Sequence, residues 1–198
     1  MNHAHLFDQV DAAFGRFDVQ HPRDGMRLGL YLEFPGEPPD VCRQELLAVF
    51  EAMRGLGDID VGLAFWVPTD PERRSPEEAL ELLERSGVGA ASAWLKRLEP
   101  QDPERDGECW TFSQGVDLSV QCAATLAEVV LLGDFGTWNG VACEVFLWAR
   151  WRQVLVRFWD DRGADVLFAD AATLRRHRLP FALRGRGELR KLFRPPTR

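Results

Sequence analysis

The chain lacks the short motifs by which many enzymes are identified from sequence alone. It has no serine or cysteine in a recognisable nucleophile elbow, no glycine-rich loop that could cradle a phosphate, and no His-Glu metal-binding helix. Residues 134–136 read Asp-Phe-Gly, as in protein kinases, but none of the other kinase motifs is present. The sequence therefore favours a non-enzymatic protein, and it predicts no catalytic residue, no metal site and no cofactor.

Signals for a membrane or for secretion are also missing. The first residues show no basic stretch followed by an apolar run, and no segment approaches the roughly 18 apolar residues that a membrane span needs. No two cysteines form a Cys-x-x-Cys pair, so we expect buried, reduced thiols at Cys42, Cys109, Cys122 and Cys143. We expect a cytoplasmic protein without a membrane partner.

The formal charge of −7 is unevenly placed along the chain. Residues 1–170 carry 15 basic and 30 acidic groups, whereas residues 171–198 carry nine basic groups and a single acid, Glu188. This asymmetry is compatible with an acidic surface that faces a cationic partner, or with a basic arm that reaches for phosphate. It is equally compatible with a basic end that folds back onto its own acidic body.

The length and the order of the predicted elements indicate one domain. The 198 residues are enough for one buried core, and no obvious linker separates two parts. Strands and helices do not alternate regularly, and a strand meander lies near the end, which favours an α+β fold. We predict a single domain over residues 1–180, with a largely antiparallel sheet covered on one face by helices, followed by an Arg-rich tail over residues 181–198.

Apolar spacing and capping motifs predict the elements before the meander. Ser75-Pro76-Glu77-Glu78 is a capping box with proline at the first helical position, which predicts a helix over 79–85. Thr125 and Glu128 form a second capping box, which predicts a helix that ends at Gly133. The other predicted elements are helix 4–14, strand 28–34, a helix capped by Asp40 and ending at Gly55, strand 59–67, a short helix over 91–98, loop 99–107, and a hairpin of strands 109–113 and 116–122 about Gln114-Gly115.

Residues 143–170 predict a three-stranded meander. Val154, Val156 and Phe158 alternate with Leu155, Arg157 and Trp159, and the polar turn Asp160-Asp161-Arg162-Gly163 leads into a second alternating run through Val166 and Phe168. Gly163 can take the positive φ that hairpin turns require. Asp170 is placed to cap a last helix over residues 171–177.

The hairpin carries the only resemblance to a known family. Residues 159–166, Trp-Asp-Asp-Arg-Gly-Ala-Asp-Val, resemble the signature of a family of uncharacterised bacterial proteins, a domain of unknown function marked by an aromatic-Asp-Asp-Arg-Gly-x-Asp hairpin near the C-terminus. Residues 128–136 are similar to the helix that precedes it in that family, and the match spans about residues 125–178. Such proteins continue into a Tyr- and Trp-rich helix, where this chain has Arg175-Arg176-His177-Arg178. The resemblance implies the fold more than any activity.

The carboxylates of this hairpin have three interpretations. Asp160, Asp161 and Asp165, with Arg162, could form a recognition surface. They could also bind a divalent cation or act as a general acid and base, with Asp134 nearby. The structural interpretation carries the most weight, because aspartate is favoured in turns for its bonds to neighbouring backbone amides.

Two further groups of residues are candidate binding sites. Trp148, Trp151 and Trp159 lie on the meander, where they either stabilise the sheet or, if exposed beside Arg150 and Arg152, suit a protein interface. The tail offers cations that could contact nucleic acid, namely Arg184, Arg186, Arg190 and Lys191.

The function predicted from these observations is a non-enzymatic protein-binding module, immunity- or antitoxin-like, whose acidic body would be steered toward a basic protein partner such as a nuclease-type toxin. Two alternatives stay open. One is a metal-assisted hydrolase that uses Asp160, Asp161 and Asp165. The other is a nucleic-acid accessory protein that binds through the tail.

Overall fold

The computed structural model describes residues 29–33, 39–66, 75–85, 87–88, 94–98, 108–116, 118–133, 143–160, 163–182 and 190–192. The strands in these ranges are β1 (Gly29–Glu33), β2 (Ile59–Trp66), β3 (Trp94–Leu98), β4 (Glu108–Val116), β5 (Cys143–Ala149), β6 (Val154–Asp160), β7 (Gly163–Phe168) and β8 (Arg190–Leu192). The helices are α2 (Pro39–Arg54), α3 (Pro76–Arg85), α4 (Val120–Gly133) and α5 (Ala171–Ala182), with a 3-10 turn, η1 (Arg150–Arg152). The predicted helix 4–14 and loop 99–107 lie outside the described residues.

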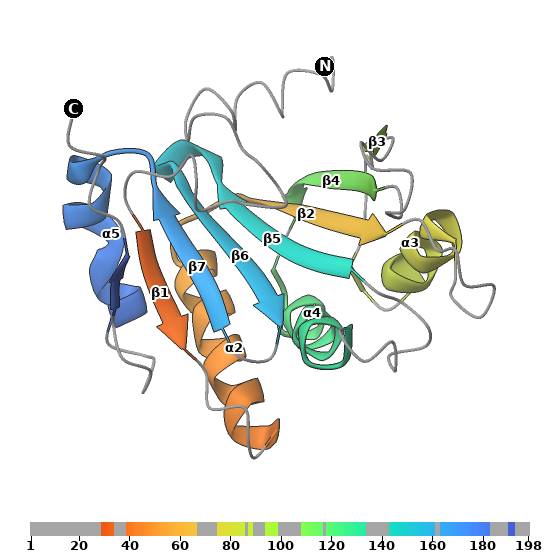
Figure 1. The fold of residues 1–198 in the computed structure, drawn as a ribbon, viewed down its shortest axis with the longest axis horizontal. Helices are drawn as coiled ribbons and strands as arrows, with labels where there is room; N and C mark the ends of the chain where they lie inside the picture. Colours follow the sequence, from red (N-terminus) through yellow and green to blue (C-terminus); the bar gives the residue numbers. More distant parts are fainter. Residues whose placement is uncertain are drawn as a thin grey trace.

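The strands form one open sheet, in which the spatial order of the strands differs from their order along the chain (Figure 1). Its order is β3-β4-β2-β5-β6-β7-β1-β8, and each neighbouring pair is antiparallel. The strands β5, β6 and β7 are the predicted meander, and they occupy the middle of the sheet. The predicted α+β fold with an antiparallel sheet is therefore confirmed.

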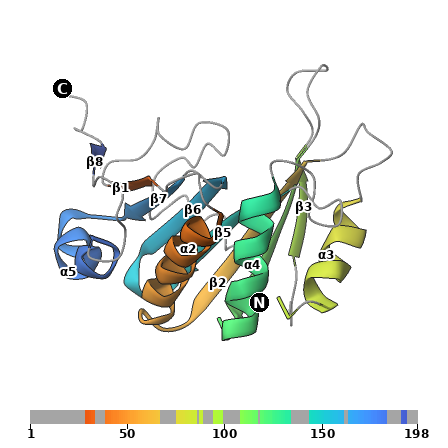
Figure 2. The ribbon, with the colours of Figure 1, turned by 90° about the horizontal axis from the view of Figure 1, so that it is seen from below.

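Helices α2 and α4 lie side by side on one face of the sheet, while α5 and α3 lie toward opposite edges (Figure 2). The apolar core fills the space between these two helices and the sheet. The ring of Phe50 on α2 stacks on that of Phe158 on β6, with centroids 4.9 Å apart. The residues that α2 buries there follow the spacing of a helix, and they are Cys42, Leu46, Val49, Phe50 and Met53.

The second face of the meander is buried as well. Phe146, Trp148, Leu155 and Leu167 point away from the core cluster under the helices, yet each is almost fully inaccessible to solvent. Burial on both faces explains why β5, β6 and β7 are apolar at nearly every position. The same face buries one basic and one acidic side chain, those of Arg157 and Asp165.

Side-chain caps begin two of the helices where the sequence predicts them. The backbone N–H of Glu78 donates to Oγ of Ser75 (3.2 Å), and the N–H of Ser75 donates to Oε2 of Glu78 (3.1 Å), which confirms the capping box of α3. The N–H of Thr173 donates to Oδ1 of Asp170 (2.7 Å), which confirms the cap of α5. Helix α5 runs beyond its predicted end, past Pro180.

The predicted strand 116–122 and the capping box at Thr125 are wrong. Residue 120 already begins α4, and Oγ of Ser119 accepts the N–H of Cys122 at 3.1 Å, so Thr125 lies inside the helix. Leu118, Cys122 and Leu126 are buried at a spacing of four residues, which is the period of a helix. The apparent alternation of apolar residues over 116–122 belongs to the start of that helical stripe.

The predicted turn at Gln114-Gly115 is a β-bulge inside one strand. Strand β4 continues from Glu108 to Val116, and its register against β2 shifts where two residues of β4, at 114 and 115, lie opposite the single residue Asp60. A glycine inside a strand is typical of such a bulge. The predicted short helix over 91–98 is also wrong, because residues 94–98 form β3 and pair with β4.

Candidate functional site

The structure separates the tryptophans that the sequence groups together. Trp148 lies on β5 and is 2% exposed, whereas Trp151 lies on η1, at the tip between β5 and β6, and is 76% exposed. The side chain of Trp159 lies outside the described residues. Trp151 is therefore the one of the two described tryptophans that a partner can reach, and Trp148 belongs to the interior of the sheet.

The hairpin carboxylates are described only in part. Asp165 is 1% exposed, and the register of β6 and β7 places it directly opposite Arg157, whose guanidinium lies 6.0 Å from the ring of Phe146. Asp160 pairs with Gly163 at the end of the strands, and its side chain is not described. Asp161 and Arg162, the two residues between these strands, lie outside the described residues. No cluster of three or more His, Cys, Asp or Glu side chains suited to a metal occurs within the described ranges.

The structure describes only some of the tail residues that were predicted to contact nucleic acid. Arg184 and Arg186 lie outside the described residues. Arg190 and Lys191 belong to β8, which adds a short strand to the sheet beside β1, but their side chains are not described.

The backbone around Trp151 is fixed by an unusual conformation at Gln153. This residue closes η1 with a φ of 53°, in the left-handed region that side chains other than glycine rarely adopt. Its N–H donates to the carbonyl of Arg150 (3.2 Å), and its own carbonyl accepts the N–H of Ala169 (3.3 Å). The tip is thereby tied to the segment that leads from β7 into α5.

Two arginines beside Trp151 tie the tip to other parts of the chain. Arg150 donates from Nε and Nη2 to one carboxylate oxygen of Asp60 on β2, at 3.0 and 2.7 Å, and its guanidinium lies 5.4 Å from the ring of Trp148. Arg152 donates from Nε to the carbonyl of Leu56 at 3.3 Å, in the turn between α2 and β2. The residues on both sides of Trp151 are therefore held in place, while its indole stays in solvent.

Helix α5 brings more positive charge to this tip. Arg175, Arg176 and Arg178 are exposed along the helix. The hydrogen bond from the N–H of Ala169 to the carbonyl of Gln153 brings the tip and the start of α5 together. Burial lowers the pKa of His177 on α5 below its ordinary value of 6.5, and the charges of Arg152 and Arg176 lower that pKa further. We call Trp151 and Arg152 of the tip, together with Arg176 of α5, the basic corner. The sequence grouped Trp148, Trp151 and Trp159 with Arg150 and Arg152 as interface candidates, and it missed the contribution of α5.

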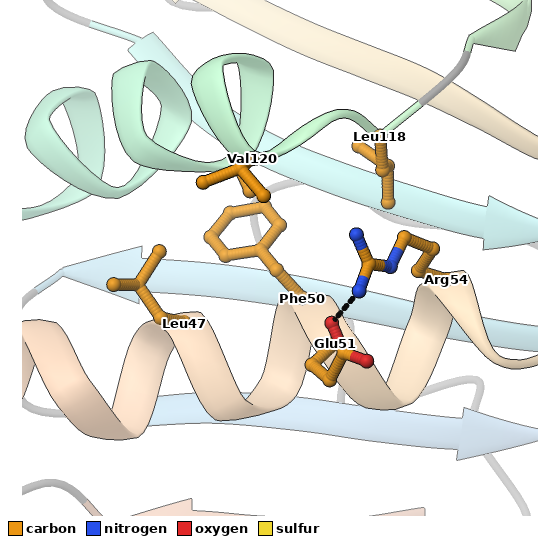
Figure 3. A pocket seen from close by; sticks show the side chains of 7 residues that line it. Leu47, Phe50, Glu51, Arg54, Leu118 and Val120 are labelled. Carbon is orange, nitrogen blue, oxygen red and sulfur yellow. Dashed lines mark hydrogen bonds and ion pairs between the residues drawn. The ribbon is translucent and has the colours of Figure 1, made fainter.

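A small cavity lies between the C-terminal half of α2 and the start of α4 (Figure 3). Its volume is about 150 Å³, below the roughly 300 Å³ at which pockets for small molecules begin. Phe50 and Leu47 approach Val120 across it, and an ion pair between Arg54 and Glu51 lies at its rim. Its lining is mostly apolar, so this cavity offers no group of acids, bases or nucleophiles.

Comparison of the chain with protein-family models, with curated proteins and with solved structures gave no match. The resemblance to a bacterial family of unknown function thus stays a prediction. Within the described residues, no helix is both long and apolar enough to cross a membrane.

Proposed function

We propose that this protein is a non-enzymatic protein-binding module that contacts its partner through Trp151. The observation that carries the proposal is an indole exposed on a tip whose backbone is already ordered. Binding through a flexible loop loses affinity because the loop must be ordered, whereas a pre-ordered tip avoids that loss. Tryptophan is also the residue type most enriched among those that dominate the binding energy of protein interfaces.

The exposure of Trp151 distinguishes it from the other large apolar residues. Among the described residues, Val120, Trp151 and Leu179 are the large apolar side chains that stay exposed. A single exposed valine or leucine is common on protein surfaces and needs no special explanation. When a partner covers a tryptophan that is 76% exposed, far more apolar surface is removed from water than when it covers a valine or a leucine.

The described residues offer less support for the two alternative functions. A hydrolase that used Asp165 would need this carboxylate to reach substrate, but it is 1% exposed and faces Arg157 across the strands. The nucleic-acid alternative depends on tail side chains that are not described. The finer proposal of an immunity- or antitoxin-like role rests on the net charge of −7 and on the missing catalytic motifs, and it stays a prediction.

The proposal is tested by photo-crosslinking from the tip. Trp151 is replaced by the photoreactive residue p-benzoylphenylalanine, and the purified full chain is irradiated in lysate of its source cells. As a matched control, the same residue is placed at Gln44, which is exposed on α2 away from the tip. We expect a discrete adduct with one protein from position 151 and none from position 44.

A second variant guards against artefacts of the crosslinker. Trp151→Ala should fold like the natural chain, because an exposed side chain contributes at most about 0.5 kcal/mol to stability. It should also compete poorly, as unlabelled protein, for the partner found at position 151. The proposal is wrong if position 151 gives no adduct with a protein, or if position 44 gives the same adduct.

A further inference from the structure

The two arginines of the basic corner form no ion pair with a carboxylate among the described residues. Arg43, Arg54, Arg85 and Arg150 each form an ion pair with an aspartate or glutamate. In contrast, the guanidinium groups of Arg152 and Arg176 form no ion pair with a described residue. The positive charge of this corner is therefore not used within the described part of the fold.

The local sequence keeps acids away from this charge. Residues 171–182 of α5 contain three arginines and no aspartate or glutamate. The nearest acid along the chain, Asp170, accepts the N–H of Thr173 as the helix cap, and this hydrogen bond and the charge of Arg175 both lower the pKa of its carboxyl. Like charges on neighbouring turns of one helix repel each other slightly, so this arrangement does not add to helix stability.

We propose that the basic corner recognises an acidic segment of a partner protein, with carboxylates on Arg152 and Arg176 and an apolar side chain against Trp151. This inference rests on the proposed function and adds the chemistry of the partner. Arginine suits such a contact, because its planar guanidinium can donate two parallel hydrogen bonds to one carboxylate. The arginines would thus bind acidic side chains of the partner, while the exposed indole would contact its apolar surface.

The charge of the rest of the chain favours a short acidic protein segment over nucleic acid. Residues 1–170 carry 30 acidic and 15 basic groups, which repel a long polyanion. Since charges are screened beyond about 8 Å at physiological salt, a short acidic segment can bind the corner without meeting that repulsion.

The inference reverses the sign of the partner expected from composition. A net charge of −7 predicts attraction of a basic protein at long range. The exposed arginines at the tip determine instead what can lie in direct contact with Trp151. The net charge of the chain thus favours the approach of basic proteins, whereas the arginines at the tip favour direct contact with acidic side chains.

Fluorescence anisotropy with defined probes tests this inference. The probes are a short labelled peptide with the repeat Glu-Glu-Leu, the same peptide with Gln in place of each Glu, and a single-stranded DNA oligonucleotide of equal length. We expect the full chain to bind the acidic peptide at least about tenfold more tightly than either other probe, with affinity falling as salt rises.

Substitutions then locate the binding on the protein. The double variant Arg152→Gln, Arg176→Gln should weaken binding of the acidic peptide about tenfold or more. The control Arg85→Gln, which removes an exposed arginine of α3, should leave binding unchanged. Equal affinity for the Gln peptide, tighter binding of DNA, or an equal loss in the control would each overturn the inference.

The two proposals can fail separately. If crosslinking from position 151 captures a discrete protein but the acidic peptide does not bind, only the inference about acidic chemistry is wrong. If position 151 captures no protein, the proposed function itself is wrong, whatever the peptide does.

Discussion

Asp60 and Arg150 form a partly buried ion pair across a sequence separation of 90 residues. Both Nε and Nη2 of the arginine donate to the same carboxylate oxygen, at 3.0 and 2.7 Å. Asp60 lies on β2 opposite the bulge of β4, and Arg150 begins the tip that carries Trp151. The pair thus connects an irregularity of the sheet to the exposed tryptophan.

Breaking this pair should destabilise the protein and loosen the tip. We expect Asp60→Asn to lower the free energy of unfolding by about 2 kcal/mol, because a hydrogen-bonded, partly buried guanidinium loses its charged acceptor. Urea denaturation measures this loss. As a control, Glu81→Gln removes the exposed pair with Arg85, and its effect should stay within about 0.5 kcal/mol. Equal effects of the two substitutions would contradict the structural role of Asp60.

Removal of the ring of Phe50 should be among the most damaging changes in the core. This ring is buried and stacks on Phe158 between α2 and the sheet. We expect Phe50→Ala to lower the free energy of unfolding by about 3–5 kcal/mol. Val120→Ala alters the opposite side of the same cavity at a side chain that is 75% exposed, and should change it by less than about 0.5 kcal/mol. Thermal or urea unfolding of both variants tests the comparison.

The left-handed conformation of Gln153 predicts opposite effects for two substitutions. Gln153→Gly removes the clash between the Cβ atom and the backbone at a φ of 53°. This change should stabilise the fold by up to about 1 kcal/mol, and the greater conformational entropy of glycine in the unfolded chain offsets part of that gain. Gln153→Val places a β-branched side chain in the same conformation and should lower stability by more than about 1 kcal/mol. If valine is tolerated as well as glycine, the tip does not have this conformation in solution.

His177 should make stability depend on pH near neutrality. Burial, then the charges of Arg152 and Arg176, lower its pKa in the folded protein below 6.5. As pH falls through 6.5, the unfolded chain therefore takes up a proton before the folded protein does, and stability is lost. The loss continues until pH reaches the lowered pKa of the folded state.

The substitution His177→Gln isolates this contribution. Urea midpoints measured from about pH 8 to pH 5 should fall less steeply for the variant than for the natural chain, since both keep the same carboxylates. Parallel curves for the two proteins would show that His177 titrates alike in the folded and unfolded states.

Local patterns in the sequence predicted the elements whose boundaries depend on nearby residues. The stripe of α2, the capping box at Ser75 and the alternation of β6 each need only a few neighbouring positions to be recognised. The meander followed from the same reasoning, because its turns are short. These elements also form most of the core, which is why the fold class could be predicted.

Elements that depend on distant strands were not predictable in this way. Residues 94–98 have no strong alternation of their own, and they form a strand because β4 is there to pair with them. Gly115 gives the same signal for a turn and for a bulge, and only the pairing with β2 decides between them. The basic corner was missed for the same reason, because it joins residues from the tip and from α5.

The position of β1 in the sheet has a consequence for how the chain folds during synthesis. Gly29 pairs with Leu167 on one side and with Leu192 on the other, so both neighbours of this strand are made long after it. At a synthesis rate of roughly 5–20 residues per second, the strand waits on the order of ten seconds for its first partner. Throughout that interval, Gly29–Glu33 presents unpaired backbone groups and two leucines to whatever binds nascent chains.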